Sequence, residues 1–205
     1  MKPDYWDSAK RSLARRDPVL ARIMRAHPRV HLEPRGEPFH TLARAIVGQQ
    51  ISVAAAQSVW NKFSGVALEV IPEKILLLKA TQLRACGLSG RKCEYITDLA
   101  RRFADGHVHV HRWPQMSDED VIEDLVQVRG IGRWTAEMFL MFNLLRPDVF
   151  PLDDLGLQKG LRLAYHQGRK ISLRTMRQRG ETWRPYRSVA TWYLWRSLDP
   201  VPVEY

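Results

Sequence analysis

The stretch from Asp118 to Gln158 constrains the fold most, because two helical patterns flank a Gly-x-Gly turn there. Ser117 followed by acidic residues is typical of a helix start, and apolar residues then recur at helical spacing. Gly130 and Gly132 permit a tight turn, and a second helix is expected to begin near Ile131. The pattern therefore predicts a helical hairpin.

This hairpin suits an anionic ligand. A helix that opens on Gly-Ile-Gly presents unpaired backbone N–H groups and the positive end of its dipole, which attract a phosphate. Arg129 and Arg133 add positive charge beside it. An ordinary helical hairpin that uses glycine only for its turn is the alternative. The predicted phosphate contacts are Gly130, Ile131, Gly132, Arg133 and Thr135.

Helical periods recur along the rest of the chain, which predicts an all-α fold. They lie at residues 3–27 (broken at Asp17-Pro18), 39–47, 53–63, 72–78, 81–86, 91–103 and 155–165. His107, His109 and His111 alternate, so they form either one face of a strand with a metal site or a solvated loop.

Charge and cysteine content narrow the function classes. A net charge of +10 in 205 residues favours a polyanionic partner, although a basic surface alone has the same composition. No apolar run reaches the length of a membrane span, and no apolar signal segment opens the chain. Cys86 and Cys93 are the only cysteines, which indicates a reducing compartment, and two thiols cannot hold a four-cysteine iron–sulfur cluster.

Two adjacent carboxylates, Asp153 and Asp154, stand at the start of the helix that follows the hairpin. Aspartate at this place is a good helix cap. One aspartate suffices for the cap, so the second is available for chemistry.

Three segments together resemble the helix–hairpin–helix superfamily of DNA base-excision glycosylases. They are Arg44-Ala45-Ile46-Val47-Gly48-Gln49-Gln50-Ile51-Ser52, the run from Leu125 to Ala136 continuing to Leu155, and Trp183 to Trp195. The resemblance covers residues 37–198 in family order and is closest to the bacterial 3-methyladenine DNA glycosylase II type. It implies a short form that lacks the N-terminal β domain of that type.

The resemblance implies a single glycosylase unit of two helical lobes. Residues 37–130 would form the middle lobe, with the hairpin at its end, and residues 1–36 with 131–205 would form the second. The hairpin would anchor DNA, and the cleft between the lobes would receive the base.

The resemblance also implies roles for particular residues. Asp154 matches the catalytic aspartate, and Asp153 is then the expected cap or orienting neighbour. Trp134 stands where strand-cleaving relatives carry a lysine, which predicts hydrolysis without lyase activity. The base pocket is expected to contain Trp134, Trp195, Met138 and Leu155. Gln50 occupies the place of the wedge that fills the gap left by a flipped base. A monovalent cation on the backbone carbonyls of Val126, Val128 and Ile131 is also compatible with the family.

The predicted function is therefore excision of alkylated purines, such as 3-methyladenine and 7-methylguanine, from duplex DNA, leaving an abasic site. The expected enzyme is a cytoplasmic, nucleoid-associated bacterial monomer that needs no cofactor. Two alternatives stay open at this point. One is a glycosylase of the same fold for another damaged or mismatched base, and the other is a non-catalytic DNA-binding module.

Overall fold

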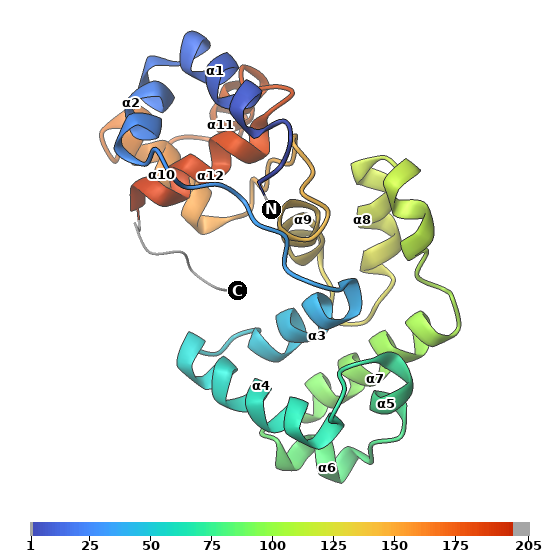
Figure 1. Cartoon of the computed structure of the whole chain (residues 1–205). Coiled ribbons are helices and arrows are strands. Elements are labelled where there is room, and N and C mark those ends of the chain that lie inside the picture. The colour runs from blue at the N-terminus through green and yellow to red at the C-terminus, as the bar shows by residue number, and fades with distance from the viewer. Residues whose placement is uncertain (1, 199–205) are drawn as a thin grey trace. The chain divides into compact units, whose positions relative to one another are not determined.

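The computed structural model of the chain describes residues 2–198, and its regular elements in that range are all helices (Figure 1). Its elements are α1 (Trp6–Arg16), α2 (Pro18–Ala26), α3 (Pro38–Gly48), α4 (Val53–Ala67), α5 (Pro72–Leu76), α6 (Ala80–Ala85), α7 (Gly90–Ala104), the 3₁₀ helix η1 (Val110–Gln115), α8 (Asp118–Val126), α9 (Arg133–Phe142), α10 (Leu155–His166), α11 (Leu173–Glu181) and α12 (Arg187–Leu198). The described residues contain no strand, so the all-α prediction is confirmed.

The described chain divides into two compact units. Residues 35–139 form one of them, called here the middle unit, and residues 2–34 with 140–198 form the other, the terminal unit. The hairpin was expected to mark the boundary, between residues 130 and 131. The two compact units meet between residues 139 and 140, within α9, and the lobe boundaries expected from the resemblance stay a prediction.

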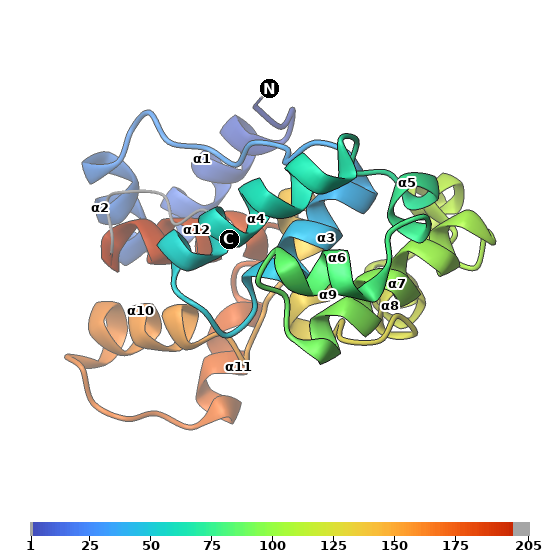
Figure 2. The ribbon, with the colours of Figure 1, turned by 90° about the horizontal axis from the view of Figure 1, so that it is seen from below.

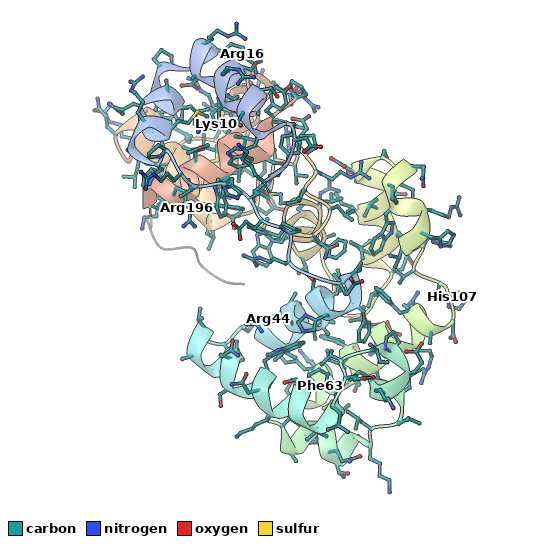
Figure 3. All side chains as sticks on the ribbon, in the orientation of Figure 1. Lys10, Arg16, Arg44, Phe63, His107 and Arg196 are labelled. Carbon is teal, nitrogen blue, oxygen red and sulfur yellow. The ribbon has the colours of Figure 1, made fainter. Side chains whose placement is uncertain are left out.

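The middle unit is organised around α7, on which α3, α5 and α6 pack, while α4 packs on α3. Hydroxyl caps begin three of its helices: the side chains of Ser52, Ser89 and Ser117 each accept the backbone N–H three residues further on. Phe63 is fully buried and points into this unit from α4 (Figure 3). In these three helices the hydroxyl cap lies directly before the segment that carries the buried apolar residues.

The buried carboxylate of Asp17 joins three segments of the terminal unit by hydrogen bonds. In this unit α1, α2 and α12 contact one another, and α10 packs on α12 (Figure 2). Asp17 begins α2, as the predicted break requires, and its Oδ1 accepts the N–H groups of Val19 and Leu20. Its Oδ2 accepts the Tyr165 hydroxyl at 2.8 Å and the Trp183 indole N–H at 2.9 Å. Burial and the neighbouring negative charge raise the pKa of Tyr165, so this hydroxyl stays a donor.

The alternating histidines do not form a strand, so the first of the two alternatives, a strand face with a metal site, is wrong. His109 precedes η1, and its Nδ1 lies 2.7 Å from Asp124 Oδ1. Asp124 Oδ2 also accepts the His109 backbone N–H and the Trp113 indole N–H. This carboxylate from α8 organises the segment into a turn. Across residues 2–198, no group of three or more His, Cys, Asp or Glu side chains is arranged to hold a metal ion.

Two helices differ from the expected pattern. The second helix of the hairpin begins at Arg133, two residues after Ile131, near which its start was expected. The Ile131 N–H belongs to the turn and donates to the Val128 carbonyl at 3.1 Å. Helix α11 was not expected, since its arginine-rich sequence buries only Met176 and Gly180 and carries a weak apolar stripe.

No helix within the described range has the length and apolarity needed to cross a bilayer.

Candidate active site

The hairpin turn brings backbone to the surface. Gly130 has φ of +85°, which glycine adopts without strain. A side chain at Gly130 would overlap the ring of Tyr95, so the close approach of these two residues also requires glycine. Gly132 is exposed, and the space in front of it is open. A ligand can therefore approach the start of α9 closely.

The arginines of the hairpin are already paired with carboxylates. Arg133 donates to both oxygens of Glu119, at 2.6 and 2.7 Å, and to Glu137 at 3.2 Å. The hydrogen bond from Arg133 lowers the pKa of Glu119. Arg129 is 3.0 Å from Glu94. Both side chains are thus partly neutralised, so the positive charge they bring to the turn is smaller than the sequence suggests.

Two further residues expected to contact phosphate have buried side chains. Ile131 is 4% exposed and Thr135 is 8% exposed. The Gly132 carbonyl accepts the Ala136 N–H at 3.1 Å, which opens α9. Of the predicted phosphate contacts, the backbone N–H groups at the start of α9 remain the best suited to bind an anion.

The loop between α3 and α4 is joined to the hairpin within the middle unit. Gln50 is exposed and has φ of +58°, a conformation that L-residues other than glycine seldom adopt. Its neighbour Gln49 donates from Nε2 to the Gly130 carbonyl at 2.9 Å. Lys92, whose pKa is lowered by burial, donates to the Val47 carbonyl at 2.7 Å. The contacts made by Gln49 and Lys92 were not predicted, because they join positions distant in sequence.

Asp154 combines the roles of helix cap and candidate catalytic group. It is 7% exposed, and its Oδ1 accepts the Leu157 N–H at 2.6 Å. The same oxygen accepts the indole N–H of Trp195 at 2.8 Å. Asp153 is exposed and does not begin the helix, so the expectation that Asp153 would be the cap is wrong. The positive end of α10 favours a carboxylate at this place.

An aromatic stack holds Trp195 from the side. Its ring lies nearly parallel to that of Phe142, with centroids 5.9 Å apart and an interplanar angle of 13°. Phe142 in turn meets Trp192 edge to face at 6.0 Å. The sequence did not connect Phe142 with the site, because that contact depends on how distant segments of the chain pack.

The other residues expected in the base pocket lie in different surroundings. Leu155, in the terminal unit, is 78% exposed. Trp134 and Met138 belong to the middle unit, where Trp134 is half-buried and Met138 is buried. Their joint role in a pocket stays a prediction.

Known proteins match this arrangement over most of the chain. Residues 43–185 match the family model of the HhH-GPD superfamily base excision DNA repair protein. The chain is 35% identical over 169 residues to a Bacillus subtilis protein described as putative DNA-3-methyladenine glycosylase YfjP, with 78% of this chain and 59% of that protein covered. The chain thus spans less than two thirds of that relative's length.

Two solved structures are similar to this one. The DNA-3-methyladenine glycosidase of Bacillus halodurans has a TM-score of 0.84 at 32% identity, over 92% of this chain and 87% of that one. The Schizosaccharomyces pombe 3-methyladenine DNA glycosylase Mag1, in complex with abasic DNA, has a TM-score of 0.81 at 32% identity, over 96% and 100%. With the family match over more than half of its residues, the chain belongs to the HhH-GPD superfamily of base excision DNA repair proteins.

Proposed function

We propose that this chain is a DNA-3-methyladenine glycosylase of base excision repair, which hydrolyses the bond between an alkylated purine and its deoxyribose. The observation that carries the proposal is the Asp154 carboxylate, buried at the N-terminus of α10 and held by two N–H donors. The relatives described as 3-methyladenine glycosylases support it, since their similarity extends over most of this chain.

The chemistry requires an anion at a fixed place. As the base departs, the electron pair of the broken bond leaves with it and positive charge develops on the sugar at C1′. A preorganised carboxylate stabilises that charge, and it accepts a proton from the attacking water. The hydroxyl bonds to C1′, and an abasic site remains. Asp154 is the group that would do this.

No amine nucleophile is needed for this reaction. Trp134 stands where strand-cleaving relatives carry a lysine, so no covalent imine with the sugar is expected there. We therefore expect base release without strand cleavage.

Alkylated purines suit an aromatic pocket. Methylation at ring nitrogen gives 3-methyladenine and 7-methylguanine a positive charge in DNA, and indole rings attract cationic groups. Trp195, whose indole is hydrogen-bonded to Asp154, would supply such a ring to the flipped base, and Trp134, Met138 and Leu155 stay predicted pocket residues. The charged leaving group also departs easily, so a loosely shaped pocket is sufficient.

Duplex DNA containing a damaged base is the expected partner. The backbone N–H groups of the hairpin would bind phosphate, and Gln50 would enter the gap left by the flipped base. Further positive charge follows Asp154 directly: residues 155–180 contain seven Lys or Arg and no Asp or Glu. Phosphates neutralised by such residues release counterions, which favours binding.

No cofactor enters the proposal. Cys86 and Cys93 are buried free thiols, and burial raises the pKa of each. The Val128 carbonyl accepts a hydrogen bond from within the turn, and a monovalent cation on Val126, Val128 and Ile131 remains a prediction. We expect a monomer that acts in the compartment holding the DNA.

The experiment is base release from methylated duplex DNA by wild type and Asp154→Asn. Asparagine is as good a cap as aspartate, so the variant should fold. We expect wild type to release 3-methyladenine and 7-methylguanine without cutting the strand. The variant should lose about 10²-fold or more in rate and keep its DNA affinity.

Other outcomes would redirect the proposal. Wild type that binds DNA but releases neither base would exclude alkylpurine excision. A panel of other lesions would then separate a glycosylase of different specificity from a DNA-binding module without activity.

A further inference from the structure

One oxygen of Asp154 is held by two donors. Oδ1 accepts two N–H groups, from Leu157 at 2.6 Å and from Trp195 at 2.8 Å. A carboxylate oxygen has two lone-pair directions, so these donors occupy both of them. The two hydrogen bonds therefore fix the orientation of the carboxylate.

Gly156 lies against this pair of hydrogen bonds. A Cβ at this position would be 3.0 Å from Asp154 Oδ1 and 3.1 Å from the indole nitrogen of Trp195. It would also be 3.2 Å from Cδ1 of the same indole. All three distances are shorter than ordinary van der Waals contact, so a methyl group would displace at least one of these atoms.

Helix geometry gives no other reason for glycine at this position. Gly156 lies in the first turn of α10, and its φ is not in the left-handed region. Alanine is the better helix former at such a position. Helix propensity would thus favour alanine at position 156. Glycine there permits the close approach of Asp154 Oδ1 and the Trp195 indole.

Neither neighbour can move away at little cost. The Trp195 ring is stacked on Phe142, with an interplanar angle of 13°. Asp154 Oδ1 is the cap of α10, so its displacement would weaken the start of the helix. A methyl group between them would change the orientation of the carboxylate.

We propose that Gly156 and Trp195 are positioning residues for Asp154. Trp195 fixes Oδ1 through its indole N–H, and Gly156 leaves the space in which this hydrogen bond forms, so that the carboxylate keeps one orientation. This inference rests on the proposed glycosylase function.

The test compares two glycines of one helix. Gly160 also lies on α10, and a Cβ there would meet Leu194 of α12 at 3.1 Å, away from the carboxylate. Gly156→Ala and Gly160→Ala therefore crowd similarly tight contacts in the same unit. For each we would measure the single-turnover rate on methylated duplex, the dissociation constant for DNA containing an abasic analogue, and the melting temperature.

We expect the two variants to differ. Gly156→Ala should lower the single-turnover rate roughly 10-fold or more at unchanged DNA affinity, because small displacements of a reacting group are costly in rate. Gly160→Ala should lower the melting temperature and leave the single-turnover rate near that of wild type. Equal effects of both variants on the rate would overturn the proposal and reduce Gly156 to a packing residue.

A second readout follows the hydrogen bond itself. The ¹⁵N–¹H indole resonance of Trp195, identified by its loss in Trp195→Phe, should move in Gly156→Ala and in Asp154→Asn but not in Gly160→Ala. In a double-mutant cycle, Gly156→Ala should add little to the rate loss of Trp195→Phe, because both act on one hydrogen bond. Additive losses would contradict the shared mechanism.

These readouts also separate the two proposals. If wild type releases no base, the proposed function fails, while the indole resonance still tests the link between Gly156, Trp195 and Asp154. If wild type is active and the resonance does not respond to Gly156→Ala, the positioning proposal alone fails.

Discussion

The side-chain amide of Gln49 donates a hydrogen bond to the backbone carbonyl of Gly130 at 2.9 Å. This bond joins the loop that carries Gln50 to the hairpin turn, although the two residues are far apart in sequence. In the proposed function one of these elements enters the duplex and the other binds its backbone. Their connection would keep the wedge in register with the phosphate contacts.

Substitution of Gln49 by alanine should therefore affect catalysis on duplex DNA more than stability. One hydrogen bond of this kind contributes only about 1 kcal/mol to folding. We expect a slower single-turnover rate on methylated duplex, with a smaller change on methylated single strands, where no gap needs filling. Gln57→Ala is a suitable control, because Gln57 is also hydrogen-bonded in the middle unit but to Arg44 and Asn61. Similar losses on both substrates would contradict the register argument.

The strained backbone of Gln50 allows stability and activity to be separated. At φ of +58°, glycine removes a strain that costs on the order of 1 kcal/mol. Gln50→Gly should therefore melt at a slightly higher temperature and release bases from duplex more slowly, because it has no side chain to insert. Gln50→Leu should retain a wedge and most of the activity. If Gln50→Gly is as active as wild type on duplex DNA, Gln50 is not the wedge.

Sequence patterns predicted the helices well where a cap and an apolar stripe coincide. Ser117 and its acidic neighbours correctly predicted the start of α8, and the Asp17-Pro18 pair correctly predicted the break between α1 and α2. The sequence of residues 173–181 did not predict helix α11, because it is rich in arginine and only Met176 and Gly180 are buried in it.

The candidate site was less predictable than the helices. The resemblance selected Asp154 as the catalytic residue and so left Asp153 as the expected cap or orienting neighbour. Asp154 is itself the cap, which local patterns did not decide because either carboxylate suits a helix start. Contacts of Asp154 with Trp195, and of Gln49 with Gly130, depend on packing between distant segments. Such contacts have no local signature in one sequence.

Asp124 should make the middle unit sensitive to acid. Burial opposes its charge, but hydrogen bonds from the His109 backbone, the Trp113 indole and the His109 ring outweigh burial and lower its pKa. A carboxyl group whose pKa is lower in the folded than in the unfolded protein stabilises the fold above its unfolded pKa of about 4. That contribution is lost as the pH falls through the folded pKa.

Replacement of Asp124 by asparagine should remove this contribution. At pH 7 we expect a loss of about 1–3 kcal/mol in the free energy of unfolding. Asparagine replaces one of the two acceptor oxygens by an NH2 group, so an N–H donor that the carboxylate accepted then faces another donor. The difference from wild type should begin to shrink below about pH 4, where Asp124 of the unfolded wild type is protonated, and should vanish once the pH falls below the lowered pKa of the folded protein. Denaturant unfolding at several pH values measures this. Asp105→Asn, at an exposed position after α7, should show no such dependence.

The acid-free segment from residue 155 to residue 180 should determine part of the salt dependence of DNA binding. It includes a hollow of about 320 Å³ at the C-terminal end of α10 and in the loop that follows, lined by Tyr165, His166, Gln167, Arg169, Lys170 and Ile171. Five of the seven Lys and Arg side chains in this segment are exposed, among them Arg169, Lys170 and Arg174. Phosphate contacts by all three would contribute up to about 2.7 to the slope of log K against log salt concentration.

A triple substitution of these cations by glutamine should lower that slope and weaken binding most at low salt. The matched control replaces Arg11, Arg15 and Arg22 of α1 and α2, which are exposed in the same unit and remove the same charge. Equal slopes for the two triple variants would mean that only net charge matters. A lower slope for the first variant alone would show that the segment after Asp154 contacts DNA phosphates, because counterion release counts the contacts made rather than the total charge.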